Sequence, residues 1–541
     1  MRTTIEIQSV PVSKLFRWFD RRSLAIPEVQ REFVWNANRA CALLDSIFQG
    51  YPVGTVMIWK TGRQRQSMLR QTLHVLPTFD PAQNKEILFL LDGQQRLSVL
   101  HNVRMGTTVS NESGREIRFG DIFFSLDGEE TGNHFVYLRR HDPEIHFRAT
   151  DILRGVCKPH GVKRSKAIEG CRDRILTYRL PVVFSRTNEV EHVRETFIRI
   201  NSQGMRIRES EKAFSQAQKV GAIHLFHQLK AHMSPGYTGI SKDVYWNTLA
   251  LARGYRSLGQ KSTSRLSKDI EKTEEGESWF KAEEQPIAIA IRKACDYLQN
   301  VFGVKSLAFL PSENMIAVLA LFFRANGGQP SAAQARQIRT WFWHVATAQR
   351  YSGANLDRHI TEDVDFFTKL GETHRGKFHI QQRTPIYKLR LGTYNASSAL
   401  AKAYRLLLMQ SGPCYLENGE PIPLDQVSAS ENKKQLHHII PRAVLSRLDV
   451  PEEQQNLICN ICYLVANENQ SFGGRAPSIY LRDFRKKKHF AATMRSHLIP
   501  HGADSPLWGK PSKASFKRFL DARATVLAAA FARVAGTKLF E

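Results

Sequence analysis

The spacing of apolar residues changes along the chain, and each change predicts a different kind of structure. Up to about residue 210, short apolar runs are separated by glycine-containing turns. The clearest run covers residues 87–91, and Asp92-Gly93 separates it from a segment with helical spacing. A strand that turns at a glycine into a helix is predicted here. A further strand is predicted over residues 54–59, after a helix that Gly50 closes. The first 210 residues therefore predict a mixed α/β domain.

From residue 211 to about 405, apolar residues recur at helical spacing. The pattern predicts helices over residues 211–232, 286–302, 314–324, 332–349 and 397–409. Trp341, Phe342 and Trp343 are too close in sequence to lie on one helical face, so their helix is expected to be buried on more than one side. Residues 261–277 are rich in Ser, Thr, Lys and Glu, and a mobile loop is predicted there. This region is expected to be a helical connecting domain.

The last part of the chain begins with a polar linker and an apolar run that contains two histidines. The run ends at Pro441, and a second apolar strand is predicted over residues 461–465. A basic segment and a helix over residues 515–534 follow. We therefore expect an α+β multidomain protein with domains at residues 1–210, 211–405 and 406–541.

The charge balance narrows the class of partner. The chain has 541 residues, with 77 Lys and Arg against 51 Asp and Glu, a net charge of +26 and a pI near 9.9. Such an excess favours a polyanionic partner, most commonly nucleic acid, over a generally solvated basic surface. Seven scattered cysteines, an odd number, favour a reducing cytoplasmic location over a disulfide framework. The longest apolar run, residues 315–323, is far too short to span a membrane, and the N-terminus lacks a signal-peptide pattern.

The corner from Asp92 to Arg96 is one candidate site. A helix that begins at a glycine turn presents free backbone N–H groups, and Arg96 adds a positive charge, so the corner can hold phosphate. The alternative is that Asp92 caps the helix and Arg96 forms a salt bridge. Polar residues also lie beside turns at Gln30-Arg31 and at Asn201, and three such places favour a convergent pocket.

The two histidines are the second candidate site. Hydrolysis of a phosphodiester needs a base that takes a proton from the attacking water. It also needs a positive centre that stabilises the negative charge developing on the phosphate and on the leaving oxygen. Adjacent residues of a strand point to opposite faces, so His437 and His438 can share a site only if the strand ends there, and Pro441 permits this end. His438 is assigned as the general base and His437 as a metal ligand. Asn460 is expected to orient the His438 imidazole, and Asn469 to be the second ligand of Mg²⁺ or Mn²⁺. A zinc site at Cys459 and Cys462 is the alternative, although a second cysteine pair is missing from the sequence.

A basic run follows the histidine stretch directly. Such a run is usually a solvated face. Next to a candidate phosphodiesterase site, however, it is well placed to neutralise a DNA backbone. The residues expected to do so are Arg485, Lys486, Lys487 and Lys488.

These motifs resemble two known families. The pattern from His437 to Pro441, with Asn460, Asn469 and Pro477, resembles the HNH (ββα-metal) nucleases. The first half is similar to the ParB/sulfiredoxin-like N-terminal domain of the GmrSD restriction endonucleases. The matching segments there are Ile26-Pro27 with Gln30-Arg31, Leu44-Asp45-Ser46-Ile47 with Gly50-Tyr51-Pro52, Asp92-Gly93-Gln94-Gln95-Arg96, and Phe197 with Asn201 and Gly204.

The resemblance implies an NTP-regulated endonuclease or nickase of host defence, related to type IV restriction enzymes and SspE-like antiphage effectors. By motif position the nucleotide would contact Gln30, Arg31, Asp92, Gly93, Gln94, Gln95, Arg96 and Asn201. The expected partners are double-stranded DNA, which can be modified, an NTP of unknown identity and a second copy of the chain in a homo-oligomer. The sequence departs from the family patterns at three positions. Val29 stands where the GmrSD family often has an aromatic residue, and His437 stands where many relatives have Asp or Glu. Phe472 stands where the HNH domain of the RNA-guided nuclease Cas9 has a lysine.

Two other functions fit the same sequence. One is a nucleotide-switched DNA-binding protein of ParB type that does not cleave, and the other is a related nuclease that acts on RNA. A one-metal mechanism does not itself distinguish the sugars. Cleavage of plasmid DNA would separate the first function from both alternatives.

Overall fold

The computed structural model describes most of the chain, as two compact units. The described residues are 4–27, 33–62, 75–110, 116–187, 193, 196, 210, 213–214, 217–423, 436–463 and 473–541. The division falls between Met1–Ile223, here called unit 1, and His224–Glu541, called unit 2. The domain boundaries expected at residues 210 and 405 stay predictions.

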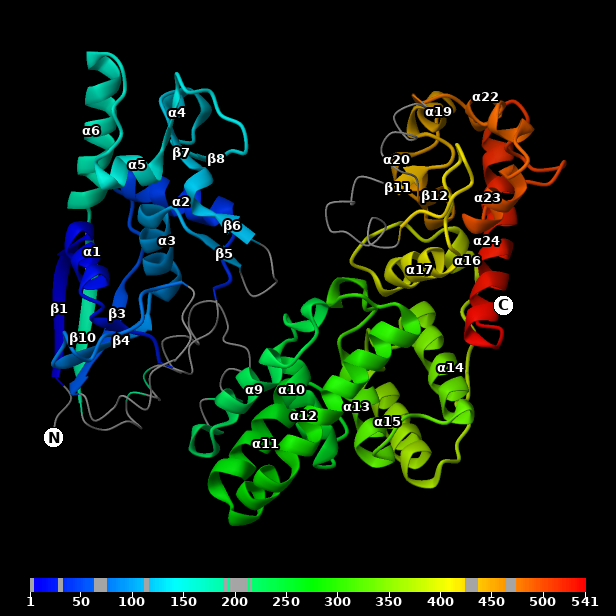
Figure 1. Cartoon of the computed structure of the whole chain (residues 1–541), viewed down its shortest axis with the longest axis horizontal. Coiled ribbons are helices and arrows are strands. Elements are labelled where there is room, and N and C mark those ends of the chain that lie inside the picture. The colour runs from blue at the N-terminus through cyan, green and yellow to red at the C-terminus, as the bar shows by residue number, and fades with distance from the viewer. Residues whose placement is uncertain are drawn as a thin grey trace. The chain divides into compact units, whose positions relative to one another are not determined.

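Unit 1 is built on a five-stranded mixed sheet (Figure 1). The spatial order of its strands is β1 (Thr4–Pro11), β10 (Arg179–Arg186), β3 (Val56–Gly62), β4 (Glu86–Asp92) and β2 (Leu24–Ala25). The β1–β10 and β3–β4 pairs are antiparallel, whereas β10–β3 and β4–β2 are parallel. The strands predicted around residues 54–59 and 87–91 are therefore confirmed as β3 and β4.

Both faces of this sheet are covered, which explains why β4 is apolar at successive positions. Along β3, Ile58 belongs to the main core and its neighbour Trp59 to a smaller cluster on the other face. The Trp59 ring stacks on Phe89 of β4, with ring centroids 5.3 Å apart. A strand buried on both sides loses the alternation of a half-exposed strand.

The described helices of unit 1 pack around this sheet and against a smaller one. They are α1 (Val12–Asp20), α2 (Ala37–Gln49), α3 (Gln94–Met105), α4 (Gly128–Thr131), α5 (Ala149–Arg154) and α6 (Val162–Thr177). Helix α2 ends at Gly50, whose φ of 81° is the left-handed conformation that the sequence predicts at this stop. Two small sheets complete the unit, one of β5 (Thr108–Ser110) and β6 (Glu116–Arg118), the other of β8 (Phe135–Tyr137), β7 (Ile122–Ser125) and β9 (His146–Arg148).

Unit 2 is mainly helical (Figure 1). Its first half contains α9 (Ala222–Ala231), α10 (Lys242–Ala252), α11 (Gln260–Lys272), α12 (Glu274–Phe302), α13 (Asn314–Asn326), α14 (Ala332–Ala348), α15 (Leu356–Thr373), α16 (Ile386–Arg390) and α17 (Ala399–Gln410). Trp341, Phe342 and Trp343 of α14 are all at most 1% exposed, which confirms that this helix is buried on more than one side.

The mobile loop predicted for residues 261–277 is wrong. Helix α11 covers most of it, and α12 begins at Glu274 after Thr273, whose hydroxyl accepts a hydrogen bond from the Gly276 N–H. The helix is stable because it buries small polar residues together with Leu266 and Ile270. Its polar composition therefore gave a misleading signal.

The C-terminal part of unit 2 carries the histidine stretch. Strand β11 (Leu436–His438) pairs with β12 (Ile461–Tyr463) to form a two-stranded sheet. Short helices surround it, namely α19 (Arg442–Arg447), α20 (Glu452–Gln455), α22 (Pro477–Tyr480) and α23 (Phe490–Ser496), and the long helix α24 (Lys513–Ala535) closes the chain. The α+β organisation is thus confirmed. Among the described residues no helix is long and apolar enough to cross a membrane.

Candidate functional site

The corner between β4 and α3 has the strand–turn–helix form that the sequence predicts. Gly93, and not Asp92, is the N-cap of α3, with φ at 92°. A Cβ at this position would lie 3.0 Å from Cγ2 of Val56, so both the conformation and the close approach to β3 require glycine. The N–H groups of the first helical turn have no partner within the helix, which is the feature that favours an anion.

Arg96 is held by its own chain. Its guanidinium donates to the carbonyls of Val53 and Thr55, at 2.8 and 2.9 Å, and to the Asp92 carboxylate at 3.1 Å. The salt-bridge half of the alternative interpretation is therefore present, whereas Asp92 makes no capping hydrogen bond. Gly54, with φ at 84°, leaves room for the guanidinium, because a Cβ there would meet Nη1 at 2.6 Å. Arg96 thus braces the loop that faces the helix start.

The two glutamines between Gly93 and Arg96 behave differently. Gln95 accepts a hydrogen bond from the Val34 N–H at 2.9 Å, which ties the segment before α2 to the corner. Gln94 is 4% exposed, and in the described structure neither its amide nitrogen nor its amide oxygen has a hydrogen-bond partner. A buried amide without partners is costly, so this side chain is poised to receive a polar ligand.

The strand pair of unit 2 ends where the sequence predicts. In the β11–β12 register His438 lies opposite Ile461, and the chain then bends at Ile439 and Ile440 before Pro441. Asn460 holds this bend. Its backbone carbonyl accepts from the Ile439 N–H at 2.8 Å, and its amide both accepts from the Ile440 N–H at 2.9 Å and donates to the Ile440 carbonyl at 3.0 Å.

A second asparagine, Asn456, contacts the His438 ring. Its Oδ1 lies 3.1 Å from Nε2 of His438, and its Nδ2 donates to the Tyr394 carbonyl at 3.0 Å. Because a carbonyl only accepts, the Tyr394 contact decides which end of the amide is nitrogen. Oδ1 therefore faces the ring, and Nε2 must carry the proton. The His438 tautomer that results has an unprotonated Nδ1.

Asn456 itself is fixed by a short strand-like pairing. The Tyr394 N–H donates to the Asn456 carbonyl at 2.7 Å, and the Ile458 N–H donates to the Gly392 carbonyl at 2.8 Å. Thr393 and Leu457 form the antiparallel bridge between these bonds. The segment before α17 thus supports the side chain that orients His438.

The surroundings of His438 favour its neutral form. Burial is the largest cause that lowers the pKa of this half-buried histidine, and the positive charge of Arg442 lowers it further. The hydrogen bond to Asn456 acts in the opposite direction. A neutral imidazole with one free nitrogen can accept a proton at neutral pH.

The comparison with known families decides the identity of the first part of the chain. Residues 12–217 match the family model described as the N-terminal domain of the GmrSD restriction endonuclease. This part of the chain is a GmrSD N-terminal domain. A search of curated proteins gives no match to the chain.

The corner from Asp92 to Arg96 lies inside the GmrSD N-terminal domain. Three other residues expected at its nucleotide site, Gln30, Arg31 and Asn201, lie outside the described residues. Their convergence with the corner stays a prediction, as does the ParB/sulfiredoxin-like character of the domain. The HNH resemblance concerns residues beyond the GmrSD N-terminal domain, and it stays a prediction.

The two asparagines of the hairpin contact different parts of the chain around His438, and the orienting role of Asn460 stays a prediction. Asn460 is completely buried and bonds to backbone groups of Ile439 and Ile440 and to the Gln455 carbonyl, so its side chain does not reach the His438 ring. Asn456, which the sequence argument did not single out, makes that contact. It stands 18 residues after His438 and Asn460 stands 22 after it, and sequence spacing alone does not choose between them.

His437 precedes His438 on β11 and is the more deeply buried of the two histidines. Its side chain is 6% exposed, and its ring meets Tyr480 edge-on with the centroids 6.0 Å apart. The second expected ligand, Asn469, lies outside the described residues. Within the described parts of the chain no three His, Cys, Asp or Glu side chains are grouped to hold a metal. The metal-ligand roles of His437 and Asn469 stay predictions.

A buried polar network supports the hairpin from α24. Arg523 is fully buried and donates to the Cys459 carbonyl at 3.3 Å, the Tyr404 hydroxyl at 2.8 Å and the His497 carbonyl at 3.2 Å. The Tyr404 hydroxyl in turn donates to the Ile461 carbonyl. The network therefore joins α17, α24 and β12 in one rigid support.

The two cysteines of the hairpin have the environment of core residues. Cys459 is 0% and Cys462 2% exposed, and neither forms a disulfide. Burial raises the pKa of the Cys459 thiol to about 12, and the thiol donates to the Leu389 carbonyl. The core interpretation that the sequence favours agrees with this burial, and the zinc site stays an untested alternative.

The four basic residues of the predicted DNA contact differ in availability. Arg485 lies over the Trp508 ring at 4.6 Å, and Lys487 is half-buried and bonds to Glu417. Lys486 pairs with Asp483 at 3.1 Å, although both side chains are largely exposed. Lys488 is exposed and has no ion pair among the described residues. Lys488 is therefore the most available cation of the run.

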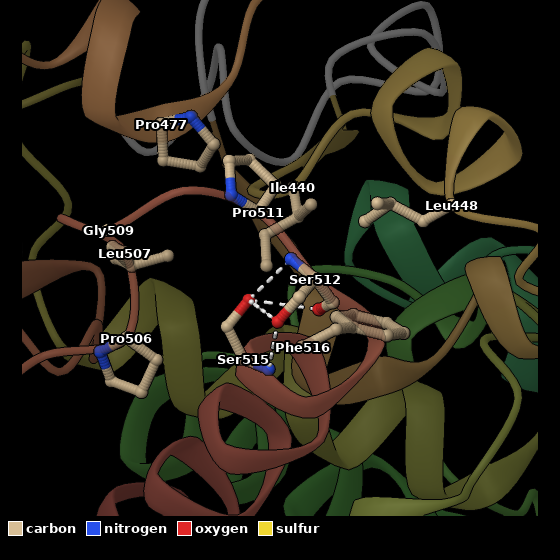
Figure 2. Close-up of a pocket in the computed structure, with 10 residues that line it drawn as sticks. All are labelled: Ile440, Leu448, Pro477, Pro506, Leu507, Gly509, Pro511, Ser512, Ser515 and Phe516. Atoms are coloured by element: carbon tan, nitrogen blue, oxygen red, sulfur yellow. Dashed lines mark hydrogen bonds between the residues drawn. The ribbon is translucent and has the colours of Figure 1, made fainter.

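A small pocket lies beside the hairpin and has no catalytic lining (Figure 2). Its walls are mostly apolar, from Ile440, Leu448, Pro477, Pro506, Leu507, Gly509, Pro511, Ser512, Ser515 and Phe516. The two serines are already paired in the capping box that begins α24, as the dashed lines in Figure 2 show. The pocket separates the start of α24 from the bend after His438.

Proposed function

We propose that the chain is a metal-dependent DNA endonuclease of host defence against phage or modified foreign DNA, regulated by an NTP. The family model that matches residues 12–217 describes the N-terminal domain of a restriction endonuclease. The single observation that carries the nuclease assignment is the hydrogen bond between His438 and Asn456, which leaves Nδ1 of the ring as a base at the end of a strand.

In the proposed reaction, Nδ1 of His438 accepts a proton from the attacking water. Asn456 holds the ring through Nε2, and this hydrogen bond stabilises the imidazolium that forms. Asn460 keeps the bend at Ile439 and Ile440 in place, so that the base stays fixed relative to the scissile phosphate. The residues near the base therefore position it and set its proton.

A divalent cation suits the ligands that remain. The imidazole of His437 and the amide oxygen of Asn469 are two donors, and Mn²⁺ or Mg²⁺ accepts such ligands while it keeps positions for water and phosphate oxygens. When bound, the cation would stabilise the negative charge on the phosphate and on the leaving oxygen.

An NTP suits the corner of the GmrSD N-terminal domain. The first N–H groups of α3 offer an anion site, and the buried amide of Gln94 has no hydrogen-bond partner in the described structure. Asp92, Gly93, Gln95 and Arg96 shape this corner through the contacts described above. We propose that NTP binding or hydrolysis here controls cleavage by the hairpin.

The test uses supercoiled plasmid with Mg²⁺ or Mn²⁺, with and without each NTP. Wild-type protein is expected to nick or linearise the plasmid, and His438→Ala is expected to lose this activity. His379→Ala changes an exposed histidine and serves as the matched control. Equal cleavage by wild type and His438→Ala would overturn the assignment. Binding without cleavage under any metal would favour the ParB-type switch, and cleavage of RNA alone would favour the RNA nuclease.

A further inference from the structure

The loop between α5 and α6 exposes apolar residues within a basic stretch. The chain leaves α5 at Gly155 and enters α6 after Gly161, and both glycines have positive φ, at 72° and 95°. Between and beside them, Val156 is 59% and Val162 74% exposed. Figure 1 shows α6 leading from this loop back to β10. One valine thus lies at the start of the loop and the other at the start of α6.

The charges around these valines are almost all positive. Residues 139–179 contain eleven Lys and Arg against five Asp and Glu. Arg154, Lys158, Lys163 and Lys166 are exposed, and none of them forms an ion pair with a described residue. Lys163 and Lys166 lie three positions apart on α6 and so share a face.

An ion pair holds a second basic loop against the same helix. Arg164 of α6 bonds to Glu144, in the loop between β8 and β9. That loop also carries Arg139 and Arg140, both exposed. One of the few acidic residues in the region is therefore used to anchor a loop, and it does not neutralise the exposed cations.

We propose that this face of unit 1 binds the phosphate backbone of duplex DNA. It is called the α6 basic surface here and consists of Arg154, Lys158, Lys163 and Lys166 around Val156 and Val162. The cations would neutralise phosphates, and the valines would contact the sugar edges between them. An anionic membrane is a poorer fit, because residues 154–166 contain no Trp, Phe or Leu to enter the bilayer.

The inference rests on the proposed function in one respect, since it takes DNA to be the substrate. It adds that the GmrSD N-terminal domain binds DNA through a surface of its own, which is separate from the basic run that follows the hairpin. Phosphate contacts carry no sequence information, so this surface would hold any duplex. Recognition of a modification would then need other groups.

The test measures binding of a 30-base-pair duplex by the full chain, by fluorescence anisotropy in EDTA over a KCl series. Lys158→Glu, Lys163→Glu and Lys166→Glu are combined in one variant. The matched control combines Lys261→Glu, Lys268→Glu and Lys272→Glu, at three exposed lysines of α11. Both triple variants change the net charge equally. Only the first is expected to weaken binding, by about tenfold or more, and to reduce the salt slope by roughly 3.

The two triple variants distinguish an effect of where the lysines lie from an effect of the total charge of the chain. Equal loss in the two triple variants, or no loss in the first, would overturn the inference, as would binding to vesicles of anionic lipid but not to DNA. The corresponding Lys→Gln triple variant, which removes the three charges without reversing them, is gentler on folding and is expected to show a smaller loss of the same kind. Because EDTA removes divalent metal, this result does not depend on cleavage. Failure of the nuclease proposal appears only in the plasmid assay.

Discussion

Nε2 of His438 lies 3.1 Å from Oδ1 of Asn456, and the Tyr394 carbonyl on the far side of the amide fixes the direction of this hydrogen bond. The contact decides which ring nitrogen is free. A backbone carbonyl 62 residues upstream of Asn456 thus sets the tautomer of the proposed base. Changes at Asn456 should therefore alter catalysis more than binding.

Replacing Asn456 by Ala should lower kcat for plasmid cleavage by about ten- to a hundredfold, because the ring loses the partner that fixes its orientation and tautomer. KM for DNA should stay nearly constant. The wild-type rate should rise with pH through the lowered pKa of His438, with its midpoint below about 6.5.

Asn456→Asp gives a sharper test of the same contact. A carboxylate next to Nε2–H raises the pKa of the ring, so the acid limb of the pH–rate profile should move to higher pH. Asn418→Asp, on an exposed loop, adds the same charge elsewhere in unit 2 and should leave the profile in place. An unshifted profile in Asn456→Asp would falsify the assigned role.

Asn460→Ala should lower the free energy of unfolding by about 2–4 kcal/mol, because it leaves the buried N–H and C=O of Ile440 without partners. The loss is measured by urea unfolding, monitored in the full chain. Asn300→Ala, at an exposed position of α12, is the control and should change stability little. A near-neutral effect of Asn460→Ala would mean that the bend does not depend on this side chain.

Gln94→Met should separate ligand binding from folding in the GmrSD N-terminal domain. Methionine has a similar volume and removes a buried amide without partners, so stability should stay the same or rise by about 1 kcal/mol. NTP affinity, measured by calorimetry, should fall. Unchanged affinity would show that the Gln94 amide is not a nucleotide ligand.

Arg96→Ala offers the contrasting case in the same corner. Because Arg96 braces Val53 and Thr55, its loss should lower both stability and NTP affinity. Only Gln94→Met is expected to change one without the other.

Stability of unit 2 should fall in mild acid. His497 is 1% exposed, and burial lowers its pKa to about 4, whereas the unfolded value is near 6.5. The native state therefore binds fewer protons in this window. The stabilisation is fully present above about pH 6.5 and is lost as the pH falls towards 4, by about 3 kcal/mol at most. Thermal unfolding between pH 4 and 8 measures it, and His497→Gln should flatten the curve more than the exposed His379→Gln.

The sequence predicted elements where one local signal decides the structure. The apolar run of β4, the glycine at the start of α3 and the proline after the hairpin bend each act within a few residues. Prediction failed where burial involves small polar side chains, as with Ser262 and Ser267 of α11, which are at most 2% exposed. Nothing in their polarity signals a buried helical face.

The candidate site shows the same division. Sequence indicated that His438 stands at a strand end, because the strand and its stop are local. It did not indicate Asn456 as the partner, because that depends on the distant Tyr394 carbonyl. Arg96 donates to the backbone carbonyls of Val53 and Thr55. A backbone carbonyl is present whatever side chain stands at that position. Roles set by backbone groups far along the chain leave no residue pattern.

The bridge between Thr393 and Leu457 also bears on how the nuclease can be isolated. A fragment that begins at residue 406 keeps both histidines and both asparagines of the hairpin, but it lacks the strand segment that orients Asn456. Such a fragment would contain every residue of the motif and still have a base free to rotate and to exchange tautomers. A minimal nuclease should therefore begin before α16, and its activity would then report on the hairpin in its native form.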